Sequence, residues 1–319
     1  MKKALPLLLL CLLLYGCAGD PLARLANPPE AGIPAPVVSG QPENHDLATL
    51  WFRLGNEPLL APEFRIITHS RAEGHALAIL QALLAGPGAA SADLSPLFPQ
   101  GTQVISCTQA GNVMFVMLSK HIMNHYADEP SAWYDQPQWA YEVPIRRQLA
   151  MQSIAATLTE NCNVDSVVIL VEQSGSDSLR LRQHYFTLDG NDALADPLIR
   201  DESLLLTPAR TVEVILQCWQ EGDFARLYRY VAASDPASGT ARPSESEFLS
   251  MMANAPRLLH AATEGGSISA SGQSAVFTVS GAWLENGRET PFSGRVLRLT
   301  REQGIWRVAL SELQKEAQP

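Results

Sequence analysis

The chain has 319 residues, of which 46% are hydrophobic and 18% charged, and its formal net charge is −10. This length suffices for about two domains with real hydrophobic cores. The ordinary glycine and proline contents exclude collagen-like and wholly disordered proteins. Only four of the 23 basic residues are lysines and no basic stripe is present, which argues against nucleic-acid binding and against a polybasic membrane-surface patch.

The N-terminus has the pattern of a secretory signal. Lys2 and Lys3 precede a short apolar run from Leu5 to Leu14, which is too short to span a bilayer core of about 30 Å. The run ends in Leu-Tyr-Gly-Cys-Ala, which resembles a bacterial lipobox with Cys17 as the lipidation site. That resemblance implies a diacylated cysteine and a protein anchored to the extracytoplasmic face of the cell membrane. A plain signal peptide cleaved nearby is the alternative.

Composition shifts divide the chain into five parts. A segment rich in proline and glycine follows Cys17 and is typical of an extended tether. A polar, acidic stretch beginning near Asp189 predicts a link between two folded domains. The predicted parts are a signal peptide (1–16), an anchor and tether (17–47), a first domain (48–186), a linker (187–206) and a second domain (207–316).

The first domain is predicted to mix strands and helices. Apolar runs separated by turn residues predict strands, and leucines at helical spacing before a Gly-Pro-Gly sequence predict a helix that ends there. Val113 and its neighbours, after Gly111, predict the second strand of a hairpin. The predicted elements, in chain order, are strands 47–54 and 63–68, a helix 71–85, hairpin strands 102–106 and 113–118, a helix from Pro144 to about Asn161, and a central strand 166–171.

Three segments of this domain carry a resemblance to a known family. They are Leu83-Leu84-Ala85-Gly86-Pro87, Phe98-Pro99-Gln100-Gly101-Thr102, and Ala156-Thr157-Leu158-Thr159-Glu160 followed by Val164. In this order they resemble the GerMN domain of germination protein M and related envelope lipoproteins, over residues 48–172. The resemblance implies an α+β fold and a role in sporulation or germination, and it implies no catalytic residue.

The second domain is predicted to begin with helices and to continue with long strands. Thr207 and Pro208 are typical of a helix start, Gly222 of its end, and Asp223 of the cap of the next helix. A third helix is expected at 245–252. Long strands at 274–284 and 290–300 flank Asn286-Gly287, a strong hairpin signal, and a further strand follows at 305–310.

Helices followed by a curved antiparallel sheet resemble the nuclear transport factor 2-like superfamily, so we expect two α+β domains, the second a cone. Members of that superfamily include enzymes and non-catalytic modules, so fold alone does not give function. Trp219, His260, Trp283 and Trp306 are candidates to line a pocket in this cone, and a packed aromatic core is the alternative.

The search for reactive groups gives no catalytic residue and no cofactor. His121 and His125 are four residues apart, as zinc-binding histidines on a helix can be, but no third ligand is evident and Pro130 would end such a helix. We therefore expect no metal there, and we interpret His69 and His75 as surface residues. The three cysteines that follow Cys17 are expected to be small buried side chains, although one pair could form a disulfide.

An insert between residues 120 and 143 is unusually aromatic. Exposed tryptophan and tyrosine favour recognition because they give large contact areas at low entropy cost. The insert is therefore the candidate partner-binding surface, unless these rings cover the sheet or the other domain. The residues concerned are Trp133, Tyr134, Trp139 and Tyr141.

Together these features predict a membrane-anchored, non-enzymatic envelope protein that acts through contacts with envelope or sporulation proteins and could form homo-oligomers. The alternative is an extracytoplasmic small-molecule-binding lipoprotein, or an enzyme, that uses a pocket in the second domain. A solute-binding lipoprotein of a transporter fits the anchor but not the domain order, which lacks repeated βαβ units.

Overall fold

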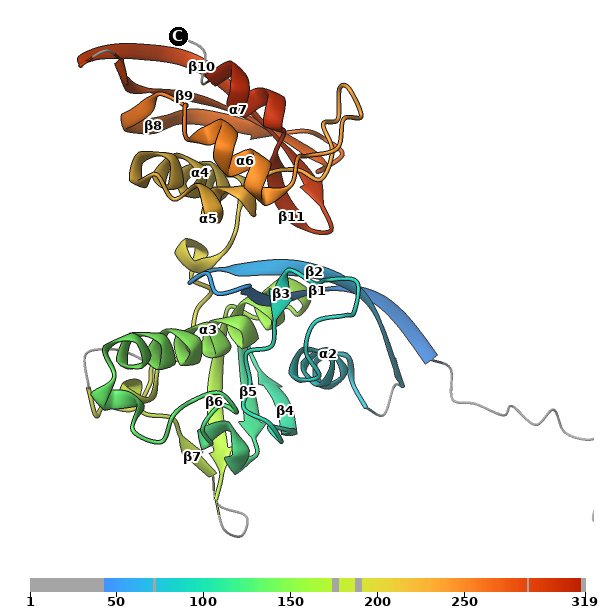
Figure 1. The fold of residues 1–319 in the computed structure, drawn as a ribbon. Helices are drawn as coiled ribbons and strands as arrows, with labels where there is room; N and C mark the ends of the chain where they lie inside the picture. The colour runs from blue at the N-terminus through green and yellow to red at the C-terminus, as the bar shows by residue number, and fades with distance from the viewer. Residues whose placement is uncertain (1–42, 71–72, 174–177, 187–190, 286, 317–319) are drawn as a thin grey trace, which may run out of the picture. The chain divides into compact units, whose positions relative to one another are not determined.

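The computed structural model describes residues 43–70, 73–173, 178–186, 191–285 and 287–316. The predicted signal peptide, Cys17 and the tether up to residue 42 lie outside the described residues. Within the described ranges, no helix has the length and apolar character needed to cross a membrane. The described chain mixes helices with three sheets (Figure 1), which confirms the predicted α+β class.

Two sheets are built from the residues before 187. One has the strand order β2-β1-β3 and the other β4-β5-β6-β7. β5 and β6 are parallel, and helix α3 makes the crossover between them. The elements are β1 (Glu43–Leu54), β2 (Leu60–Ser70), α2 (His75–Leu84), β3 (Leu94–Ser95), β4 (Val104–Ala110), β5 (Val113–Leu118), η1 (Lys120–Met123), η2 (Trp133–Asp135), α3 (Pro137–Asn161), β6 (Ser166–Glu172), β7 (Ser178–Arg180) and η3 (Gln183–Tyr185).

Most of the predicted elements in this region are confirmed. β4 and β5 form the expected antiparallel hairpin, and β6 is central because β5 and β7 flank it. β1 begins at Glu43, four residues before the predicted start, and pairs with β2 from Glu43 to Arg53.

The predicted start of α3 at Pro144 is wrong. The helix begins at Pro137, and Pro144 lies inside it. Gln136 has the extended backbone that a residue before proline prefers, so the helix starts at Pro137. The turn before Pro144 stays helical because Val143 is fully buried and Glu142 pairs with the buried Arg53 of β1.

Helix α3 is attached to β1 through side chains. Ser153, Thr157 and Asn161 recur every four residues, so they lie on one helix face. The Ser153 hydroxyl donates to the Trp51 carbonyl (2.6 Å), and the Thr157 hydroxyl accepts from the Trp51 N–H (3.1 Å). The Asn161 amide exchanges two hydrogen bonds with the backbone of Thr49, at 2.8 and 2.9 Å. These three side chains therefore take the place of a neighbouring strand along this part of β1.

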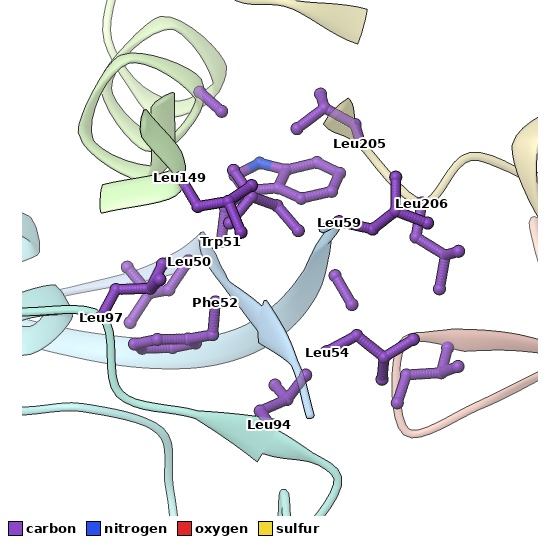
Figure 2. Packing of buried hydrophobic residues seen from close by; sticks show 14 of the residues in the cluster. Leu50, Trp51, Phe52, Leu54, Leu59, Leu94, Leu97, Leu149, Leu205 and Leu206 are labelled. Carbon is purple, nitrogen blue, oxygen red and sulfur yellow. The ribbon is translucent and has the colours of Figure 1, made fainter. Parts of the chain in front are cut away.

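The side chains on both faces of β1 are buried in the part of the strand that α3 contacts. Figure 2 shows Leu50 and Phe52 with Leu97 on one side of the strand, and Trp51 beside Leu149 of α3 on the other. The alternation follows from the period of two in a strand. β1 is consequently a central element of the hydrophobic core, although a polar helix face lines one of its edges.

The segment predicted as a linker is hydrogen-bonded to the sheets. Leu198 exchanges backbone hydrogen bonds with Val167 of β6, at 2.7 and 2.8 Å. The Leu206 N–H donates to the Leu60 carbonyl (2.7 Å), and Figure 2 shows Leu205 and Leu206 near Leu59 in the core. A 3-10 helix, η4 (Glu202–Leu204), lies within it. This stretch is polar in sequence, yet its leucines are anchored.

The residues after 207 form a separate antiparallel meander with the strand order β11-β10-β9-β8. α4 packs against β8, and the predicted caps are confirmed: the Thr207 and Asp223 side chains accept from backbone N–H groups, and Gly222 has φ +71°. The elements are α4 (Pro208–Glu221), α5 (Phe224–Tyr228), α6 (Glu245–Met252), β8 (Arg257–Ile268), β9 (Ser274–Glu285), β10 (Arg288–Glu302), β11 (Ile305–Val308) and α7 (Leu310–Glu316).

One long strand of this sheet is missing from the sequence-based prediction. β8 is exposed along most of its length and contains Gly265 and Gly266, so it lacks an apolar alternation. Gly266 is required by a close approach, since a Cβ there would lie 2.2 Å from the Phe277 ring. The pairing of β8 with β9, rather than its own composition, makes it a strand.

The α3–β1 attachment predicts a specific loss of stability. Thr157→Val keeps the shape of the side chain but leaves the buried Trp51 N–H without an acceptor, which costs about 1–3 kcal/mol. Urea unfolding of the two proteins measures the difference in free energy of unfolding. Thr159→Val is the matched control, because the Thr159 hydroxyl bonds only within its own helix, to the carbonyls of Ala155 and Ala156. An equal effect of both variants would contradict this account.

Candidate partner-binding surface

The aromatic insert is held on α3 by two consecutive arginines. The Arg146 guanidinium lies over the rings of Tyr126 (4.8 Å) and Trp139 (5.8 Å). Arg147 lies over Trp133 (5.6 Å) and Tyr185 (4.8 Å). Arginine stacks well on aromatic faces because its planar guanidinium is weakly hydrated. The insert is therefore anchored through the two arginines.

A buried carboxylate fixes the loop that precedes these rings. Glu129 has a fully buried side chain. It accepts from the Tyr126 N–H (3.0 Å), contacts His125 Nδ1 at 2.6 Å and pairs with Arg147 at 3.6 Å. A buried charge is tolerated only when it is paired and hydrogen-bonded, so these partners explain why Glu129 can be buried.

Two further carboxylates surround Arg146. Asp128 binds it through both oxygens, at 2.7 and 3.2 Å, and Glu142 accepts from it at 3.1 Å. The hydrogen bond from Arg146 holds the pKa of Asp128 below its ordinary value. Burial acts to raise the pKa of Glu142, but hydrogen bonds and charge from Arg53 and Arg146 outweigh it and lower that pKa. Both groups therefore stay ionised at neutral pH.

The pKa values of two buried tyrosines are shifted upward, in the opposite direction to those of the carboxylates. Burial raises the pKa of Tyr185 to about 12, and it also raises the pKa of Tyr126. The Tyr185 hydroxyl donates to the Ile122 carbonyl, so it serves as an anchor. These tyrosines and the two carboxylates therefore keep one protonation state near pH 7.

The four predicted contact residues divide into two kinds. Trp133 and Trp139 are half-buried under the arginines. Tyr134 and Tyr141 are 65% and 61% exposed. The Tyr134 ring meets the Trp133 ring edge-on, with centroids 6.1 Å apart. The two tryptophans are thus partly covered by the arginines, whereas the two tyrosines are largely exposed.

A cavity of about 350 Å³ adjoins Tyr185 at the β6–β7 end of the sheet. Its apolar lining includes Val171, Leu179 and Leu181, and charged residues such as Lys120 and Arg180 stand around it. This cavity is not predictable from the sequence, because η1, β6, β7 and η3 each contribute only a few side chains. No local pattern marks their convergence.

Of the residues proposed for a pocket in the second domain, the three tryptophans are buried and His260 is exposed. Trp219, Trp283 and Trp306 are at most 4% exposed. The rings of Trp219 and Trp283 lie 5.2 Å apart. His260 points away into solvent, with a side chain 65% exposed beside Glu289. The packed aromatic core, the alternative interpretation, describes the tryptophans better.

The histidine pair His121 and His125 is not on one helix face. η1 ends at Met123, so the four-residue spacing has no helical meaning here. Both histidines are exposed, and His125 contacts Glu129 as described above. The interpretation of His69 as a surface residue is wrong, since it is only 6% exposed; its surroundings are considered below.

Within the described residues, Cys107, Cys162 and Cys218 are free thiols. Cys218 is buried and the other two are half-buried. Burial raises the pKa of Cys107 and of Cys218 to about 12. Such thiols are poor nucleophiles because the thiolate is the reactive form, which agrees with a structural role.

Residues 55–176 match the model of the Germane family, described as sporulation and spore germination. The match covers less than half of the chain and includes the whole aromatic insert. None of the curated proteins matches the chain significantly.

Three of the similar solved structures are distant from the chain in sequence. The tandem GerMN domains of the sporulation protein GerM from Bacillus subtilis share 16% identity (TM-score 0.31), over 49% of this chain and 47% of that one. A provisionally assigned lipoprotein from Clostridium perfringens shares 22% (TM-score 0.28), over 50% and 91%. A provisionally assigned polyketide cyclase from Xanthomonas campestris shares 15% (TM-score 0.20), over 34% and 93%. The chain thus spans about half the length of the tandem GerM protein.

The charges around α3 predict a pH dependence of stability. The folded-state pKa of Glu142 lies below its ordinary value of 4.5. Its contribution is therefore complete above pH of about 4.5 and is lost as the pH falls through the lower folded-state value. We expect Glu142→Gln to reduce the free energy of unfolding at about pH 6 by more than it does at about pH 3, measured by urea unfolding at each pH.

Glu264→Gln, at an exposed position on β8, is the control for this measurement. It should change the free energy of unfolding little at either pH. If the Glu142→Gln deficit were the same at both pH values, the Arg53–Glu142 pair would not be responsible.

Proposed function

We propose that this chain is a membrane-anchored, non-enzymatic envelope protein that acts through protein contacts in sporulation or spore germination. The observation that carries the proposal is the match of residues 55–176 to a family described by those two processes. The lipobox-like sequence at Cys17 supports the anchor, and the two exposed tyrosines on a rigid insert support the contacts.

The insert has the physical character of a binding surface. A partner gains most from side chains that are already ordered, because little conformational entropy is then lost on binding. Arg146 and Arg147 supply that order, and Tyr134 and Tyr141 supply exposed aromatic area. Asp135, the residue after Tyr134, is an exposed acidic residue, so a partner with basic groups around an apolar centre fits best.

The second candidate function is small-molecule binding. The cavity near Tyr185, rather than the second domain, favours it, because its volume and apolar lining suit a small ligand. Basic residues beside an apolar cavity would select an anionic amphiphile. If a chain lacking both exposed tyrosines fully complemented a null strain, small-molecule binding at this cavity would be the favoured function.

The contact surface predicts a phenotype. Tyr134→Ala with Tyr141→Ala should leave the fold intact, because both rings are exposed, and should impair complementation of a null strain. The readouts are sporulation efficiency and spore germination. Each anchor of a contact hot spot contributes about 2 kcal/mol or more, which corresponds to roughly thirtyfold in partner affinity.

Ile268→Ala with Leu249→Ala is the matched control, since these apolar side chains are also exposed but lie on β8 and α6. The control chain should complement fully. Equal complementation by the tyrosine variant and the control would remove the insert from the proposal.

The anchor predicts a second phenotype. Cys17→Ser removes the acceptor for the acyl chains, so the protein should move from the detergent phase to the aqueous phase and lose acyl labelling. Two acyl chains hold a protein on a membrane stably, since each buried methylene contributes about 0.8 kcal/mol. Cys11→Ser, inside the predicted signal peptide, is the control and should keep the label. Unchanged labelling of the Cys17→Ser chain would refute the anchor.

A further inference from the structure

Two histidines and an aspartate come together where β1, β2 and α2 meet. Asp46 lies near the start of β1, His69 near the end of β2, and His75 is the first residue of α2. Asn44 pairs opposite His69, and Asp46 is two residues further along, so Asp46 and His69 share one face of the sheet. His75 lies close to the same point, because its Nδ1 atom is 3.4 Å from Asp46 Oδ2.

The three side chains place their ligand atoms at metal-site distances. Asp46 Oδ2 lies 2.9 Å from His69 Nε2 and 3.4 Å from His75 Nδ1, and all three atoms are within 4.8 Å of one another. Two atoms bound at about 2.0–2.1 Å to a tetrahedral zinc ion lie about 3.3 Å apart. A cation can therefore enter this cluster with only small side-chain movements.

The protein surroundings also suit a metal site. His69 is 6% exposed, and its other ring nitrogen, Nδ1, lies 3.3 Å from the Ser70 carbonyl. A backbone carbonyl on the second nitrogen is the usual device that orients a metal-binding histidine. The Nδ1 atom of His75 is buried and makes no hydrogen bond among the described residues, although Asp46 Oδ2 lies 3.4 Å from it. A buried polar atom without a hydrogen bond is costly, and a cation would satisfy it.

We propose that Asp46, His69 and His75 bind a divalent transition-metal cation, with zinc as the best fit to two imidazoles and one carboxylate. The Asp46 side chain is 51% exposed, so the remaining coordination positions are open to water. The bound cation would tie the start of β1 to β2 and α2. This inference rests on the geometry of the cluster alone and does not depend on the proposed function.

The experiment is a zinc titration of the purified full chain after removal of metal with EDTA. We expect one zinc ion per chain by calorimetry and a higher melting temperature when zinc is added, because a ligand that binds only the folded state stabilises it. Asp46→Asn with His75→Ala should fold, since Asp46 is exposed and His75 half-buried. Removing a second-shell partner costs about 10–100-fold in affinity, so losing two direct ligands should weaken zinc binding by at least about 100-fold.

Two controls make the result specific. His260→Ala removes another histidine with a carboxylate 3.4 Å away, and His121→Ala with His125→Ala removes the pair at four-residue spacing. Both control chains should bind zinc as the unchanged chain does. Absence of stoichiometric zinc binding by the folded, unchanged chain would overturn the proposal. Zinc binding of full strength in the Asp46→Asn, His75→Ala chain would overturn it as well.

Discussion

The edge of β1 next to α3 is satisfied by helix side chains instead of a strand. In the described residues, β3 pairs with this edge only at Arg53 and Leu54, so Thr49 and Trp51 would otherwise have buried backbone groups without partners. Ser153, Thr157 and Asn161 supply those partners. These bonds fix the position of α3 along its axis and its rotation about that axis, because a shift of the helix by one residue would break all of them.

The position of α3 in turn determines the aromatic surface. Arg146 lies seven residues, or two turns, before Ser153, so the two side chains point to similar sides of the helix. Arg146 and Arg147 then meet the rings of the insert, and Glu142 pairs with Arg53 one turn earlier. Rigid placement of exposed tyrosines therefore follows from hydrogen bonds made far along the same helix.

β1 connects this surface to the histidine cluster. The strand carries Asp46 near its start, the backbone held by α3 in its middle, and Arg53 near its end. A cation bound by Asp46, His69 and His75 would therefore stabilise the first part of this strand against β2 and α2.

The sequence by itself determined the features that depend on neighbouring residues. Thr207, Asp223 and Gly222 act on backbone groups within a few positions, so the helix ends they mark are found as predicted. The tertiary structure alone decided what depends on distant partners. Ser153 and Thr157 are polar yet fully buried, because they bond to the backbone of Trp51, more than 100 residues away in the sequence. Likewise His69 and His75 become candidate ligands only when strand pairing brings Asp46 beside them, because the pattern of residues along the chain carries no information about that pairing.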